Sequence, residues 1–260
     1  MLVDSHCHIN FEPLSEDTEG VIQRAHDMGV EHMLCVSVNM EDYPEVLALA
    51  RSFDIIYASV GVHPTHDEGR EPSTEELVEL AQDPDVVAIG ETGLDYFRSS
   101  GDMSWQKERF ARHIHAGIES NRPLIIHTRE AALDTMDMLQ AEQASQCGGV
   151  MHCFAEDWKT AKRALDIGFY ISFSGILTFK NAQDMREVAK KVPLDLLLVE
   201  TDSPYLAPVP MRGKTNEPAF TTYVADMLAE VKGVSKEEIA RATTDNFFNL
   251  FQAANRKQAA

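Results

Sequence analysis

Residues 1–8 read Met1-Leu2-Val3-Asp4-Ser5-His6-Cys7-His8, a short apolar segment followed by two histidines two positions apart. The segment is typical of a β-strand, in which successive side chains point to opposite faces. His6 and His8 then share one face, and Cys7 points to the other. Two neutral imidazoles on one face can bind one cation, because histidine nitrogen is a common ligand for zinc and other transition metals. The chain therefore opens with a strand that carries part of a candidate metal site.

The rest of the chain repeats one pattern, in which a short β-type run is followed by an amphipathic helical segment. Eight such pairs in 260 residues predict an α/β fold, a single-domain TIM (β/α)8 barrel that spans residues 1–260. An open doubly wound sheet is the alternative, and it is disfavoured because no Gly-x-Gly-x-x-Gly turn follows the first strand. The expected strands are Leu2–His6, Met33–Val38, Ile55–Val60, Val86–Ile89, Leu124–Ile126, Gly149–His152, Phe169–Phe173 and Leu196–Val199.

Two features are expected near the C-terminus. A terminal helix from Lys236 through Leu250, capped by Ser235, should close the chain. Residues 255–260 are expected to form a frayed tail.

The composition, with 44% hydrophobic and 25% charged residues, is that of a soluble globular protein. No apolar run approaches the roughly 20 residues of a membrane helix, and Asp4 with two histidines interrupts any signal peptide, so no membrane association and a cytoplasmic location are expected. The net charge of −19 argues against binding extended duplex DNA, because that binding needs many lysines and arginines. Bound metal ions can still supply local positive charge for a phosphate at a nucleic-acid end.

The four cysteines are too few and too scattered for a disulfide framework, so reduced thiols are expected. Cys7 and Cys153 each adjoin a histidine of interest. Strand alternation predicts that each thiol points away from that histidine and packs.

Histidines and carboxylates stand where the expected strands give way to loops. In a barrel these strand ends share one face, where active sites are built. Five of the ten histidines follow apolar strands directly, which indicates a metal site because buried polar groups need partners. The residues are His6 and His8 after the first strand, His63 after the third, Glu91 after the fourth, His127 after the fifth, His152 after the sixth, and Glu200 and Asp202 after the eighth.

Six blocks in this order resemble the TatD family of metal-dependent hydrolases and nucleases. They are residues 4–8 (Asp-Ser-His-Cys-His), 61–64 (Gly-Val-His-Pro), 90–96 (Gly-Glu-Thr-Gly-Leu-Asp-Tyr), 126–129 (Ile-His-Thr-Arg), 152–154 (His-Cys-Phe) and 200–206 (Glu-Thr-Asp-Ser-Pro-Tyr-Leu). The resemblance spans almost the whole chain. It implies a TIM barrel with a two-metal site, and it places deoxyribonuclease activity, usually 3′ to 5′ on single strands, among the family's known activities.

The resemblance also implies roles for individual residues. It places His6, His8 and Asp202 on one metal, His127 and His152 on the other, and Glu91 across both. A bridging carboxylate is physically sensible, since it holds two cations about 3.5–4 Å apart so that both act on one water and the scissile group.

Other roles are hypotheses from chemistry. Asp202 is the expected general base, because a carboxylate beside the metal-bound water can take its proton. His63, Arg129 and Tyr205 are candidate substrate-binding residues. The alternative for each is a contact that serves only the structure. Glu200 is expected to orient a histidine through its other ring nitrogen. Tyr96, Phe97, Trp158 and Tyr205 are candidates for stacking on bases.

The leading hypothesis is therefore a divalent-metal-dependent hydrolase, a deoxyribonuclease that cleaves phosphodiesters at the 3′ ends of single-stranded DNA. Two divalent cations per chain are expected as cofactors, with Mg, Mn or Zn favoured. The alternative is a hydrolase of a small ester, amide, small phosphoester or aminoacyl-tRNA substrate, since loops rather than the metal cluster set specificity. A non-enzymatic metal-binding scaffold is disfavoured, because structural sites are generally closed by four ligands. The sequence leaves the oligomeric state open.

Overall fold

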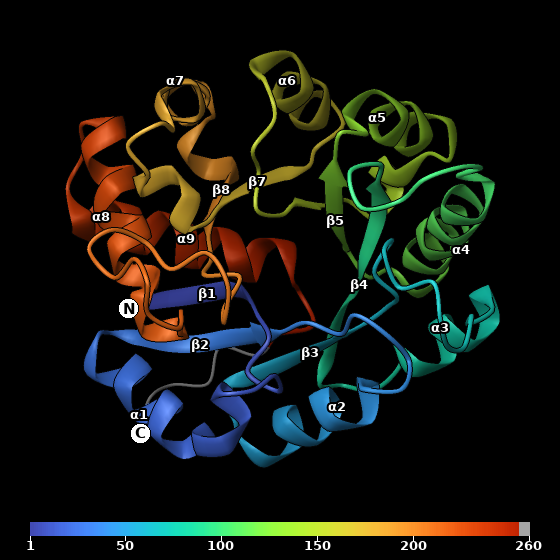
Figure 1. Ribbon diagram of the computed structural model, residues 1–260, viewed down its shortest axis with the longest axis horizontal. Coiled ribbons are helices and arrows are strands. Elements are labelled where there is room, and N and C mark those ends of the chain that lie inside the picture. Colours follow the sequence, from blue (N-terminus) through green and yellow to red (C-terminus); the bar gives the residue numbers. More distant parts are fainter. Residues whose placement is uncertain (255–260) are drawn as a thin grey trace.

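The predicted barrel is confirmed by a computed structural model, which describes residues 1–254. The strands pair in parallel and in sequence order, and the helices surround them (Figure 1). Apolar side chains on both faces of the strands explain this fold, because a parallel sheet buries both of its faces. The strands are β1 Leu2–Cys7, β2 Val30–Cys35, β3 Ile56–Val60, β4 Val86–Asp95, β5 Leu124–Arg129, β6 Gly149–Met151, β7 Tyr170–Phe173 and β8 Leu197–Val199. The expected frayed tail at 255–260 lies outside the described residues.

The terminal helix has its expected bounds, Lys236–Leu250. Several helices begin at a side chain that accepts a backbone N–H, and Ser235 caps the last helix as predicted, accepting from Glu238. The α-helices are α1 Thr18–Asp27, α2 Tyr43–Ser52, α3 Thr74–Leu80, α4 Ser104–Ser120, α5 Ala132–Ala141, α6 Trp158–Asp166, α7 Gln183–Lys191, α8 Thr221–Lys232 and α9 Lys236–Leu250. Short 3-10 helices are η1 Leu14–Asp17, η2 Ala144–Gln146, η3 Gly175–Thr178, η4 Leu194–Leu196 and η5 Pro218–Phe220.

β4 is longer than the sequence predicted. The expected strand stopped at Ile89, whereas β4 continues to Asp95 and pairs with β5 along that extension. Gly93 makes the extension possible: its φ is +139°, and a Cβ there would lie 2.0 Å from the His127 carbonyl oxygen. Glu91, Gly93 and Asp95 occupy every second position of the extended strand, so the carboxylates of Glu91 and Asp95 point to the same face.

Side chains and loop backbone help close the barrel between β1 and β8. Asp4 is fully buried and accepts hydrogen bonds from the backbone N–H of Thr201 at 2.9 Å and from its hydroxyl at 2.6 Å. Burial raises the pKa of Asp4 to about 8, against the opposing effect of these bonds. The Asp202 N–H donates to the His6 carbonyl at 3.0 Å, so closure also fixes the start of the loop after β8.

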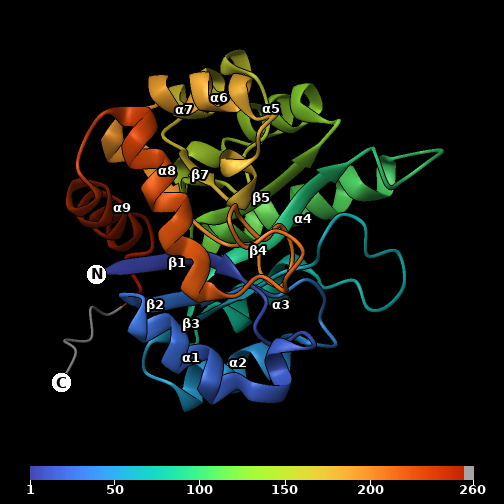
Figure 2. The same cartoon turned by 60° about the vertical axis from the view of Figure 1, so that its left-hand side comes forward.

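The two ends of the barrel are covered differently. At the amino ends of the strands, Phe247, Phe248 and Phe251 pack on strand residues such as Val3 and Tyr57. The loops after β3, β4 and β8 project on the opposite side from α9 (Figure 2). The candidate site residues lie at the loop end of the barrel.

Within residues 1–254, the structure contains no helix of the length and apolarity that a bilayer-spanning segment requires.

Candidate metal centre

Four histidines surround one buried carboxylate at the loop end of the barrel. Glu91 Oε1 lies 2.8 Å from His152 Nε2 and 3.1 Å from His127 Nδ1. Its Oε2 lies 3.4 Å from His6 Nε2 and 3.9 Å from His8 Nε2. Each carboxylate oxygen thus faces a different pair of these four histidines, and a fifth histidine, His63, also lies against Oε1.

The orientation of three of these histidines is set by an acceptor on their far side. An N–H donated outward leaves the unprotonated nitrogen of a neutral imidazole facing Glu91. The acceptors are the Val36 carbonyl oxygen for His8 at 3.0 Å, Asp95 for His127 at 3.0 Å and Glu200 for His152 at 3.2 Å.

This arrangement requires positive charge at its centre. A nitrogen lone pair and a carboxylate oxygen 2.8 to 3.1 Å apart repel unless a proton or a cation lies between them. Burial would raise the pKa of Glu91, but the histidines, His152 and His63 foremost, hold it well below its usual range. Burial would lower the pKa of His152, but Glu91 and Glu200 raise it well above its usual value. The donor set of imidazole and carboxylate fits divalent cations such as zinc or manganese.

A buried imidazole nitrogen also lacks a partner. Among the described residues, His6 Nδ1 is buried and has no hydrogen-bond partner. Ligand atoms lie within 4.8 Å of one another in three sets, which are His6, His8 and Glu91; His6, His152 and Asp202; and His63, Glu91 and His127. The six residues expected to hold metal therefore meet in one place.

Asp202 stands at the edge of this cluster. Its Oδ1 lies 3.7 Å from His6 Nε2 and 3.6 Å from His8 Nε2. Burial would raise its pKa, but a hydrogen bond with His8 and the nearby histidines lower it, so the carboxylate is ionised. Its φ of +55° is unusual for a residue other than glycine, and it aims the side chain back toward β1.

His63 has the opposite orientation to the other histidines. The Thr65 hydroxyl lies 2.8 Å from His63 Nδ1, and the Thr65 backbone N–H, which can only donate, lies 3.1 Å from it, so the hydrogen of the neutral ring is assigned to Nε2. That Nε2 lies 3.3 Å from Glu91 Oε1 and 3.3 Å from His127 Nδ1. Burial lowers the pKa of His63, which favours the neutral ring. His63 therefore presents a hydrogen-bond donor to the cluster.

Asp95 is a site residue to which the sequence reasoning gave no role. It is 1% exposed, it accepts from His127, and the Gln106 side chain holds its backbone at 3.0 and 3.1 Å. The sequence pattern in residues 90–96 could have indicated this role, because Asp95 follows Glu91 by four residues and therefore lies on the same face of a strand. The predicted strand ended at Ile89, so this relation was missed. Glu200, in contrast, lies against His152 where a histidine-orienting carboxylate was expected.

Cys153 departs from its predicted position. The thiol lines the pocket over the cluster, because β6 ends at Met151 and Cys153 has a φ of +43°, so strand alternation does not extend to it. Burial raises its pKa well above the usual value, which keeps it a thiol. Cys7 is buried on the far side of β1, as predicted.

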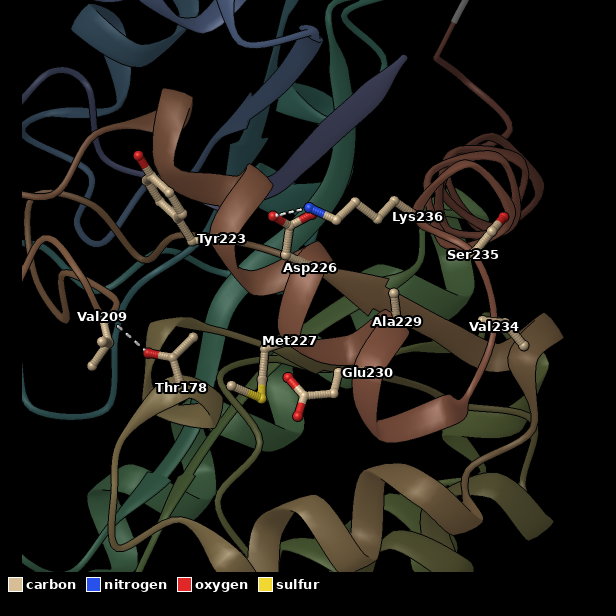
Figure 3. A pocket seen from close by; sticks show the side chains of 10 residues that line it. All are labelled: Thr178, Val209, Tyr223, Asp226, Met227, Ala229, Glu230, Val234, Ser235 and Lys236. Atoms are coloured by element: carbon tan, nitrogen blue, oxygen red, sulfur yellow. Dashed lines mark hydrogen bonds and ion pairs between the residues drawn. The ribbon is translucent and has the colours of Figure 1, made fainter.

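A pocket of about 840 Å³ opens over the cluster. Arg129 and Tyr205, predicted as substrate-binding residues, are exposed at its margin, whereas Trp158 packs on the core away from it. A second hollow of about 560 Å³ lies beside α8 and the start of α9 (Figure 3). Three charged residues line it, of which Asp226 and Lys236 are paired with each other and Glu230 is the third, and its lining includes no histidine. The chemistry-bearing groups therefore belong to the first pocket.

Comparisons with known proteins show what this chain is similar to. Residues 3–252 match the family model described as TatD related DNase. The chain is 49% identical over 254 residues to the uncharacterized metal-dependent hydrolase YcfH of Escherichia coli K12, covering 96% of this chain and 95% of that protein. It is 42% identical over 255 residues to the corresponding hydrolase YabD of Bacillus subtilis 168, covering 97% and 99%. The crystal structure of YjjV, a TatD homologue from E. coli K12, superimposes with a TM-score of 0.90 at 32% identity, covering 96% of this chain and 98% of that one.

Proposed function

This chain belongs to the TatD family of metal-dependent hydrolases, and from that membership we propose that it is a deoxyribonuclease acting on the 3′ ends of single-stranded DNA. The observation that carries the proposal is the pair of histidine sets on the two oxygens of Glu91. That arrangement suits two cations sharing one carboxylate, a grouping found in enzymes that cleave phosphodiesters. The pocket above it is open enough to admit the end of a strand.

In this proposal, His6, His8 and Asp202 would hold one divalent cation, His127 and His152 would hold the other, and Glu91 would be a ligand of both. Bound there, the cations act as Lewis acids and make a water molecule more acidic. Asp95 and Glu200 keep the rings of His127 and His152 turned toward the centre.

The remaining residues act on substrate and protons. Asp202, ionised and beside the histidines, accepts the proton of the attacking water. His63 donates its Nε2–H to a non-bridging oxygen of the scissile phosphate as negative charge develops there.

A gel assay tests the function. The metal-free protein should leave 5′-labelled single-stranded DNA intact, and added magnesium, manganese or zinc should restore a stepwise ladder of products shortened from the 3′ end. Intact DNA with every metal, from protein that binds two metal equivalents and hydrolyses a small ester, would contradict the nuclease proposal and favour the small-ester alternative.

Asp95→Asn should weaken metal binding about 10–100-fold, because the neutral amide of the introduced asparagine cannot hold the His127 ring as the carboxylate does. Isothermal titration of the metal-free protein with manganese measures this change. Asp134→Asn is the matched control, since Asp134 is a part-buried carboxylate bonded to Tyr96 and Lys107 rather than to a histidine. Equal affinities in the Asp95 variant and the control would remove Asp95 from the centre.

A further inference from the structure

The arginines of this acidic protein include two contrasting groups. The first group neutralises nearby carboxylates, as expected for a chain with 42 acidic and 23 basic residues. Ion pairs of this kind are formed by Arg24, Arg51, Arg70, Arg109, Arg112 and Arg163. Among the described residues, the three arginines that line the pocket over the metal centre, Arg98, Arg129 and Arg212, form no ion pair with a carboxylate.

Two of these three are held in place by aromatic rings. The Arg129 guanidinium lies 3.8 Å from the centre of the Phe97 ring, and the Arg212 guanidinium lies 4.2 Å from that of Phe179. Arg212 also donates to the Ala207 carbonyl oxygen at 3.0 Å. Stacking fixes the plane of a guanidinium and leaves its edge N–H groups free for an oxyanion.

The third arginine is tied to the metal centre through the backbone. The N–H of Arg98 donates to Asp95 Oδ1 at 2.8 Å, while Oδ2 of the same carboxylate accepts from His127. Asp134, an acidic neighbour that bonds to Tyr96 of this loop, is already paired with Lys107 at 2.6 Å. The loop after β4 therefore presents a cation whose charge is not cancelled locally.

Arg98 lies in the loop after β4, Arg129 is the last residue of the neighbouring β5, and Arg212 lies in the loop after β8. We propose that Arg98, Arg129 and Arg212 bind the phosphates that flank the scissile one, so that this site selects a nucleic-acid strand over an isolated phosphodiester. The inference rests on the proposed nuclease function, and it names the residues that determine its specificity. Tyr205, 57% exposed at the same margin, offers a ring on which a base can stack.

The carboxylates in the pocket do not oppose this role. Glu91, Asp95 and Asp202 each contact histidines of the centre. Glu156 is the other acidic residue of the lining, and burial, Asp157 and Glu130 raise its pKa. The uncompensated charge at the margin of the pocket is therefore positive.

The test compares two substrates with the same reacting bond. Bis(p-nitrophenyl) phosphate has a single phosphodiester and no flanking phosphates, and its hydrolysis reports on the metal centre. A fluorescent single-stranded 12-mer in EDTA reports binding without cleavage, by anisotropy at several salt concentrations. The variants are Arg98→Gln, Arg129→Gln and Arg212→Gln, and the control is Arg241→Gln, which alters an exposed arginine of α9 far from the pocket.

Each pocket variant should bind the 12-mer about 3–10-fold more weakly and lower the salt slope of binding by about 0.7, whereas the control should not. Hydrolysis of bis(p-nitrophenyl) phosphate should stay within about twofold of wild type in all four. The proposal would be overturned if the pocket variants bound the 12-mer as tightly as wild type. It would also be overturned if they lost hydrolysis of bis(p-nitrophenyl) phosphate by the same factor as DNA binding. Wild-type protein that binds DNA through these arginines but cleaves neither ester would refute the nuclease function and leave the binding role standing.

Discussion

Glu91→Gln is expected to reduce turnover by roughly 10³-fold or more. Replacing an outer-shell carboxylate such as Asp95 costs about 10–100-fold, and Glu91 faces all four histidines of the proposed ligand set directly. The glutamine amide is neutral, so two cations would share a centre with one negative charge fewer. Its NH₂ group would also point a donor at one histidine pair, where a cation belongs.

The change is best followed by gel assay, metal content and thermal unfolding together. Activity and bound metal should fall, and the unfolding temperature of the metal-free protein should fall as well, since the buried histidines lose the carboxylate that pairs with them. Glu156→Gln is the control, because it alters a carboxylate of the same pocket that contacts no histidine of the cluster. A Glu91 variant with the wild-type rate and two metal equivalents would refute its bridging role.

Asp202→Asn should lower kcat by about 10²–10³-fold with little change in KM, as expected when an interaction is lost mainly in the transition state. The fold should survive, because asparagine tolerates the left-handed backbone that Asp202 adopts at φ +55°. The metal content decides the interpretation. Loss of activity with both metals retained supports the general-base role, whereas loss of one metal equivalent would assign Asp202 as a ligand alone.

The pKa of Asp202 also sets a pH dependence. Burial opposes ionisation, but His8 and its neighbours lower the pKa below the usual value of 3.8. The base is therefore already ionised above about pH 4, and its protonation should reduce the rate only as pH falls through that lowered value. A rate in the wild type that rises with pH between about 6 and 8 must come from another group.

The alternation of strands and helices was sufficient to predict the barrel and to bring six ligand candidates to one end. Local features decided the rest. β4 extends past Ile89 because Gly93 lets β5 approach closely, and that requirement appears only once the two strands are paired. The role of Asp95 and the position of Cys153 both follow from where their strands end, which periodicity places only within a few residues.

The histidine orientations were also beyond sequence reasoning. Whether a ring presents a lone pair or an N–H depends on what lies behind it, and that acceptor can be a backbone carbonyl such as that of Val36 or a side chain from another strand. His63 and His127 look alike in sequence, each following an apolar strand. The contact between the Thr65 N–H and His63 Nδ1 favours a hydrogen on Nε2 of His63, whereas His127 faces Glu91 through Nδ1.

Helix α9 has a kinetic consequence. Its phenylalanines fill the amino end of the barrel, so under the proposed nuclease function the pocket at the loop end would be the entrance for the strand and also the exit for the released nucleotide. Each cycle must then clear the nucleotide before the shortened strand can advance. Free mononucleotides should compete with the strand for that opening, and product departure is the step that would limit how many nucleotides are removed in one encounter.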